Sequence, residues 1–149
     1  MARARGQARS RTDQVQIANL YRSFVLHSTT DAGKYPIPSR IDAANSTIVP
    51  VPLPGTDQHK NTSGDLMSFM IFSGYATPEM VVSPVENNPA VQVDRLYEYE
   101  NPSRAAVPSQ ALWDPGFSGT PIDNQSYRRP PAVDGGTGHQ SYAHTMLLG

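Results

Sequence analysis

The clearest hydrophobic period of the chain lies between about Thr12 and Thr29. Its apolar residues recur at the three- and four-residue spacing that places side chains on one side of an α-helix. They are Ile17, Leu20, Tyr21 and Phe24. Gly33 suits the left-handed turn that ends a helix, and Pro36 cannot continue one. Residues 2–11 are rich in helix-forming alanine, arginine and glutamine, so we predict a helix over residues 1–30 that buries this face on another layer.

A second apolar segment predicts a short helix from about Ser63 to Phe72. Thr62 or Ser63 can cap its first turn, and Asp65 suits the positive end of the helix dipole. Gly74 closes it. The chain between the two helices is rich in proline and short polar residues, which is typical of a loop.

Alternating apolar and polar residues predict strands in the second half of the chain. The clearest alternation runs from Val91 to Tyr99 and predicts a strand with one apolar face. That face consists of Val91, Val93, Tyr97 and Tyr99. Shorter strands are predicted at Met80–Val82 and Ser141–Leu148. The order of one long helix, a loop, a short helix and several strands predicts an α+β fold, with the long helix on a small antiparallel sheet and Pro/Gly-rich loops around it. We expect one domain over residues 1–149, with the helix at 1–30 and a globular head at 31–149.

Composition excludes several classes of protein. The chain has 149 residues, enough for one compact domain and too few for two of ordinary size. It has no cysteine, which excludes a disulfide-stapled fold and any metal site that needs thiolates. The net charge of −1 argues against a strongly basic nucleic-acid binder.

The small net charge hides an asymmetry along the chain. The residues before Asp13, the first acid, include four arginines: Arg3, Arg5, Arg9 and Arg11. The rest of the chain holds eight basic and thirteen acidic residues, a net −5. Three interpretations fit the basic start: a solvated helix end, a juxtamembrane segment, or a patch that meets an acidic neighbour. Without interleaved aromatic residues it makes a poor nucleic-acid site.

The sequence offers no catalytic constellation. His139 and His144 are five residues apart, so on the predicted strand they lie on opposite faces and make poor joint metal ligands. No serine lies in a nucleophile elbow, and the glycine-rich turn at 135–138 lacks the lysine and helix of a phosphate-binding loop. We therefore predict no enzyme activity and no catalytic, cofactor-binding or metal-binding residue.

Two further candidates lie in the loops after residue 112. Asp114, Asp123 and Asp134 offer oxygen ligands to calcium, but no EF-hand spacing orders them, which favours solvated loop acids over a calcium site in the 114–134 loops. Trp113 is a candidate surface aromatic that would stack on a sugar or anchor a protein. Its burial in the core is the interpretation that we favour.

Six short blocks along the chain occur in the order of one known family. They are Ala2–Arg9, Ile17–Phe24, Asp31–Pro36, Gly74–Pro84, Ala111–Pro115 and Ser141–His144. They resemble the arginine-rich stretch, the packing helix, the turn, the apolar strand and the later landmarks of type IV pilins and type II secretion pseudopilins, which carry a prepilin-type N-terminal cleavage/methylation domain. Ser83 stands where relatives often carry cysteine. The apolar half-helix and processing site of that family are not in this sequence, so we expect it to be the soluble part of such a protein.

The resemblance implies a structural role. A pilin-like subunit assembles with like subunits or other pseudopilins into a filament of the periplasm or cell surface, and a membrane half-helix anchors it in the inner membrane. Arg3, Arg5, Arg9 and Arg11 are then the candidate assembly contact. No nucleic acid and no small-molecule substrate is expected. The alternative is a non-catalytic extracytoplasmic module that binds carbohydrate or protein through Trp113, Tyr127 and Tyr142.

Overall fold

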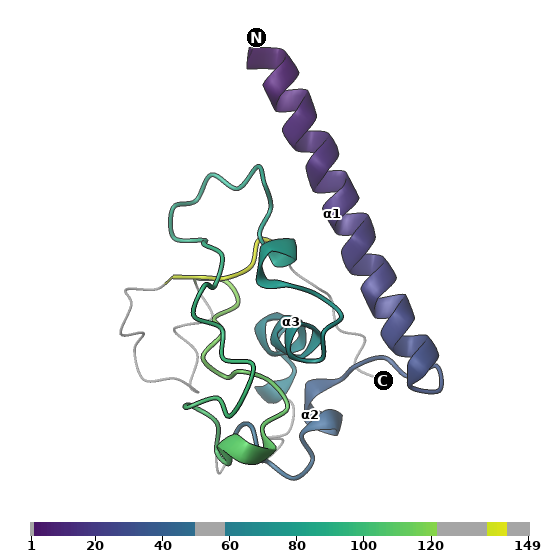
Figure 1. The fold of residues 1–149 in the computed structure, drawn as a ribbon, viewed down its shortest axis with the longest axis vertical. Coiled ribbons are helices and arrows are strands. Elements are labelled where there is room, and N and C mark those ends of the chain that lie inside the picture. Colours follow the sequence, from purple (N-terminus) through teal and green to yellow (C-terminus); the bar gives the residue numbers. More distant parts are fainter. Residues whose placement is uncertain (1, 50–58, 122–136, 143–149) are drawn as a thin grey trace.

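The computed structural model describes residues 2–49, 59–121 and 137–142, with side chains from residue 6 onward. Its elements are α1 (Ala2–Thr30), α2 (Pro38–Ile41), α3 (Ser63–Phe72) and the 3-10 helices η2 (Pro78–Val81) and η3 (Pro108–Gln110). α1 lies along one side of a body built around α3, and the N-terminal part of α1 extends beyond that body (Figure 1). None of the helices within these residues is long and apolar enough to cross a membrane.

α1 confirms the predicted N-terminal helix and the way it ends. The helix runs for 29 residues, as far as Thr30. Ala32 and Gly33 then take the left-handed conformation, with φ angles of 50° and 79°. The amide of Gly33 donates to the carbonyl of Ser28 at 2.7 Å, which satisfies one of the carbonyls left open at the helix end. Glycine adopts this conformation at the lowest cost, so the local sequence alone specifies where α1 stops.

α3 confirms the second predicted helix and forms the centre of the core. The hydroxyl of Thr62 accepts a hydrogen bond from the amide of Asp65 at 3.1 Å, which caps the first turn. Residues 64–71 are all buried, so the body covers this helix on every side. Side chains from α1, η2 and the later loops complete the core, among them Leu20, Val81, Tyr97, Trp113 and Phe117.

The predicted antiparallel sheet is wrong. Within the described ranges no strand forms, and a single β-bridge joins Val91 to Gly138 in parallel. Of the expected sheet face, Val91 and Val93 are half-buried in a loop, Tyr97 is buried, and Tyr99 is 52% exposed. Most of the predicted strand Met80–Val82 lies in η2. The predicted α+β class is therefore wrong, because the described residues form helices and loops.

Side-chain acceptors satisfy two backbone amides of the predicted strand at residues 91–99. The carboxylate of Asp94 accepts from the amide of Leu96 at 2.9 Å, and the carboxylate of Asp114 accepts from the amide of Glu98 at 3.1 Å. Backbone donors satisfied in this way need no neighbouring strand. The alternation of apolar and polar residues predicts the direction in which each side chain points. It does not show that a neighbouring strand is present to pair with the backbone.

The last predicted strand, Ser141–Leu148, is described only at Ser141 and Tyr142. Neither residue lies in a strand. The amide of Ser141 donates to the carbonyl of Val81 at 2.9 Å, so this segment lies against η2. Residues 143–148 lie outside the described residues.

A buried ion pair fixes the loop that follows α2. Lys60 Nζ lies 2.8 Å from Asp42 Oδ2, and both side chains are at most 1% exposed. Burial raises the pKa of Asp42, but hydrogen bonds from Lys60 and from the amides of Thr47 and Ile48, together with the charge of Lys60, lower it by more, and the net shift is downward. Carbonyls of this same segment accept from the amides of Ala106 and Val107, so the ion pair also holds a second loop of the body.

Candidate interaction surface on the first helix

The C-terminal half of α1 packs on the core through an apolar and aromatic contact. Leu20 is 5% exposed and belongs to the core cluster. His27 is 7% exposed, and its ring meets the rings of Phe69 and Tyr75 edge-on, with centroids 5.4 and 5.3 Å away. Phe24 is half-buried against the same cluster. These contacts make one side of α1 part of the body's own core.

A set of hydrogen bonds holds the middle of α1 against η2. Gln16 Nε2 donates to the carbonyls of Glu79 and Val82, each at 2.7 Å. The carboxylate of Asp13 accepts from the Ser83 hydroxyl at 2.5 Å and from the Tyr142 hydroxyl at 2.6 Å. These two bonds lower the pKa of Asp13. Asp13 therefore joins α1 to two segments of the body that are far apart in the sequence.

The predicted packing face of α1 divides into two parts. Leu20 and Phe24 face the body as predicted, whereas Ile17 is 48% exposed and Tyr21 is 70% exposed. The prediction that Ile17 and Tyr21 are buried is therefore wrong. With Val25, which is 44% exposed, they follow the four-residue spacing along one exposed side of α1. We call Ile17, Tyr21 and Val25 the exposed ridge.

The physical reason for this division is the width of the apolar stripe. Residues spaced by three and four cover a broad arc of the helix surface. The body contacts α1 along a narrower strip, so it covers only part of that arc. The docked side also includes polar residues that the apolar pattern passes over. The residues that face the body are Asp13, Gln16, Leu20, Phe24 and His27. Their own spacing by three and four is the signal that would have found them.

The arginines of the candidate assembly contact begin α1. Arg9 and Arg11 are exposed, and because they are two residues apart they leave the helix on nearly opposite sides. Arg3 and Arg5 lie in the helix, and their side chains are outside the described part. No acidic residue occurs in the first turn to neutralise them. The start of α1 therefore carries a positive charge that the neighbouring sequence does not balance.

Trp113 lies in the core and does not serve as a surface aromatic. It is fully buried in the cluster that surrounds α3. Its burial is the interpretation that the sequence favoured, and a ring with no exposed face cannot stack on a sugar. Tyr142 is half-buried and donates to Asp13, and Tyr127 lies outside the described residues.

The candidate calcium ligand Asp114 has internal partners. Its side chain accepts from the amides of Glu98 at 3.1 Å and of Gly116 at 2.6 Å. Burial raises the pKa of Asp114. Asp123 and Asp134 fall outside the described residues. Across the described ranges, no group of three or more histidine or acidic side chains is placed to hold a metal ion.

Of the two histidines considered as metal ligands, only His139 is among the described residues. His139 Nδ1 lies 3.2 Å from the amide of Ser118, from which the unprotonated ring nitrogen accepts, and 3.3 Å from Asp94 Oδ2, with which only a protonated ring pairs. His139 thereby connects the segment at 137–142 to two loops of the body, a role that the sequence did not indicate. His144 lies outside the described residues.

No protein-family model, no curated protein and no solved structure matches the chain. What the chain does is therefore inferred from its own surfaces, and α1 provides the most distinctive of them.

Proposed function

We propose that this chain is a non-catalytic structural subunit of a filament of the type IV pilus or pseudopilus kind. The observation that carries the proposal is the division of α1 into a docked side and an exposed ridge. Leu20 and Tyr21 are adjacent residues, yet the first is 5% exposed and the second 70% exposed. One side of α1 fixes the helix rigidly on its body, and the other side offers apolar residues to a second molecule.

The exposed ridge suits packing against another helix. Side chains at four-residue spacing form the ridges that fit the grooves of a neighbouring α-helix. Ile17, Tyr21 and Val25 supply such a ridge, and the hydrogen bonds of Gln16 and Asp13 keep its orientation fixed. A preorganised apolar ridge loses little conformational freedom when it binds. We therefore assign α1-to-α1 packing between copies to this ridge.

The proposal includes a location and partners. The partners are further copies of this chain or related subunits, with no nucleic acid and no small-molecule substrate. In this proposal an apolar half-helix ahead of α1 anchors the subunit in the inner membrane, and the head lies in the periplasm or at the cell surface. Assembly by packing needs no reaction centre, no metal and no cofactor.

The alternative function, a carbohydrate- or protein-binding module, has less support. Its carbohydrate form relied on exposed aromatic rings, and Trp113 is fully buried. Its protein-binding form would use the same exposed ridge for a different partner. The experiment below separates that partner from a second copy.

Crosslinking through one introduced cysteine tests self-assembly, because the chain has no cysteine of its own. In Tyr21→Cys, we expect disulfide-linked dimers under mild oxidation if α1 ridges of two copies meet. Leu26→Cys is the matched control, because Leu26 is 55% exposed in the same half of α1. It lies about 140° around the helix from Tyr21. Equal crosslinking of both variants, or of neither at high protein concentration, would contradict the proposal.

The same pair of positions tests filament formation. With an apolar helical segment fused ahead of Met1, we expect electron microscopy to show filaments or membrane-bound oligomers. Tyr21→Ala should reduce them, and Leu26→Ala should not. A fused chain that remains monomeric in detergent and in membranes would count against a filament subunit.

A further inference from the structure

Most of the negative charge of the body comes from one segment. Between residues 79 and 114 the sequence has two arginines and six acidic residues, a net −4. The acids are Glu79, Glu86, Asp94, Glu98, Glu100 and Asp114. Asp114 is buried and the Asp94 side chain is only 9% exposed, so Glu79, Glu86, Glu98 and Glu100 carry the negative charge of this surface. The four arginines that begin α1 carry charge of the opposite sign. The two segments therefore attract each other, whether within one molecule or between two.

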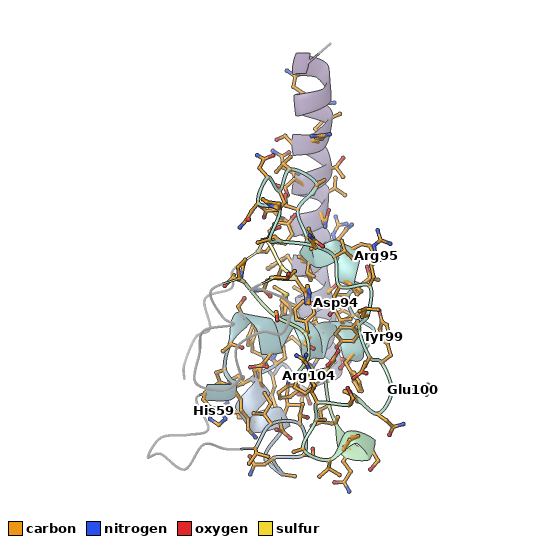
Figure 2. All side chains as sticks on the ribbon, turned by 90° about the vertical axis from the view of Figure 1, so that its left-hand side faces the viewer. His59, Asp94, Arg95, Tyr99, Glu100 and Arg104 are labelled. Atoms are coloured by element: carbon orange, nitrogen blue, oxygen red, sulfur yellow. The ribbon has the colours of Figure 1, made fainter. Side chains whose placement is uncertain are left out.

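An exposed apolar site lies in the middle of the acidic segment. Leu96 is 87% exposed, and Tyr99 is 52% exposed with its ring against buried Tyr97, the centroids 4.8 Å apart. Figure 2 shows Arg95, Tyr99 and Glu100 following one another along one edge of the body. Tyrosine and arginine are enriched among the residues that anchor protein interfaces, and an exposed leucine beside them adds apolar area to bury. We call residues 94–100 the acidic loop.

The acidic loop is held in place by its own hydrogen bonds. The amide of Leu96 donates to Asp94, and the amide of Glu98 donates to buried Asp114. Glu98 also accepts from both the amide and the hydroxyl of Ser103, which lies outside the loop, at 2.6 and 2.9 Å. A loop fixed in this way presents Leu96 without the entropy cost of ordering a flexible segment.

The basic end of α1 is placed to reach another molecule. Figure 1 shows that the start of α1 extends beyond the body, so no described part of the body lies beside the helix end. Arg9 and Arg11 are exposed, and neither forms an ion pair with an acidic residue that the structure describes. Residues 2–11 contain no large apolar side chain, so charge must dominate any contact that they make.

We propose that the basic end of α1 from one copy lies on the acidic loop of another copy. This inference rests on the proposed function and adds the second contact of the assembly, beside the packing of exposed ridges. The two surfaces differ, so each copy offers one of each and the contact repeats from copy to copy instead of closing as a symmetric pair. The contact is exposed and ionic, so it is weak in one pair of copies and sensitive to salt.

Mixed crosslinking tests this contact directly. Ser10→Cys places a thiol between Arg9 and Arg11, and Arg95→Cys places one beside Leu96 while keeping the acids of the loop. When the two variants are mixed at low salt, we expect a mixed disulfide in about fivefold excess over the disulfide of either variant alone. The matched control replaces Arg95→Cys with Ala43→Cys, an exposed position of the body outside the acidic segment.

Charge reversal then tests whether opposite charges cause the excess of the mixed disulfide. Arg9→Glu with Arg11→Glu in the Ser10→Cys chain should remove the fivefold excess, and Glu100→Arg in the Arg95→Cys chain should restore part of it. Reversal of Arg22, which is exposed farther along α1, should leave the excess unchanged. A mixed disulfide that is no more abundant than with Ala43→Cys, or that resists both high salt and charge reversal, would overturn the inference.

The outcomes also separate this inference from the proposed function. If Tyr21→Cys crosslinks while Ser10→Cys and Arg95→Cys do not, the ridge contact remains and the acidic-loop contact is wrong. If neither set crosslinks, both proposals fail. If the unmodified chain instead binds vesicles of phosphatidylglycerol and phosphatidylcholine through Arg9 and Arg11, with no mixed disulfide, the basic end belongs to a lipid surface and the inference is overturned.

Discussion

α3 and α1 use their apolar residues in different ways. α3 is ten residues long and is buried on all sides over residues 64–71. α1 is 29 residues long and buries only one side, so that Leu20 is in the core and Tyr21 is 70% exposed. Apolar residues buried within one copy stabilise that copy, whereas an exposed apolar ridge on a fixed helix is available to another. α3 therefore contributes its apolar residues to the core, whereas α1 also has a surface suited to binding.

The largest loss of stability is expected in α3. Met70 is fully buried, so Met70→Ala should lower the free energy of unfolding by about 2–5 kcal/mol through lost burial and the cavity that remains. Urea unfolding followed by circular dichroism measures this loss. The Tyr21→Cys crosslink should persist in the fraction that stays folded. Its disappearance under native conditions would show that the ridge depends on the core of α3.

The docked side of α1 should give a smaller but clear loss. Leu20→Ala should cost about 2–4 kcal/mol, because Leu20 belongs to the core cluster. Phe24→Ala should cost about 2 kcal/mol, since the side chain is only half-buried and a full loss of about 3–5 kcal/mol applies to a fully buried phenylalanine. The same urea titration compares them. A neutral Leu20→Ala would mean that α1 contributes nothing to the body's stability.

Acid should loosen the middle of α1. Hydrogen bonds from Ser83 and Tyr142 lower the pKa of Asp13 in the folded protein, so their stabilisation is present above the ordinary aspartate pKa of about 3.9 and is lost as pH falls through the folded value. After correction for intrinsic rates, amide exchange near Asp13 should be faster at pH 3 than at pH 5.

A substitution shows whether Asp13 causes this acid effect. Asp13→Asn should bring the corrected exchange at pH 5 close to the value at pH 3. Asp31→Asn, at an exposed aspartate beyond the other end of α1, is the control and should leave the pH dependence in place. Equal pH dependence in both variants would assign the effect to other groups.

The smallest effect on stability is expected on the exposed ridge. Tyr21→Ala removes a side chain that is 70% exposed, so the free energy of unfolding should change by no more than about 0.5 kcal/mol. Assembly should fall sharply in the same variant. A loss of stability similar to that of Leu20→Ala would show that Tyr21 supports the fold of one copy, and the distinction between the two sides of α1 would no longer hold.

Local sequence was sufficient for α1 and α3, for the end of α1 and for the start of α3. Thr62 and Asp65 form the cap of α3 through atoms three residues apart, and Gly33 ends α1 through its own backbone freedom. These signals need no contact from elsewhere in the chain, which is why the residues that start and stop a helix can be recognised in the sequence itself. The excess of arginine at the start of α1 is likewise a property of the sequence.

Tertiary structure alone decided how the apolar residues are used. The period in α1 groups Ile17 with Leu20, but only the position of the body determines which of them is buried. The alternation between Val91 and Tyr99 predicted a strand, yet Asp94 and Asp114 satisfy backbone amides there and no ladder forms within the described residues. Periodicity reports the direction of side chains, whereas burial and backbone pairing depend on partners distant in sequence, such as Tyr142 at Asp13.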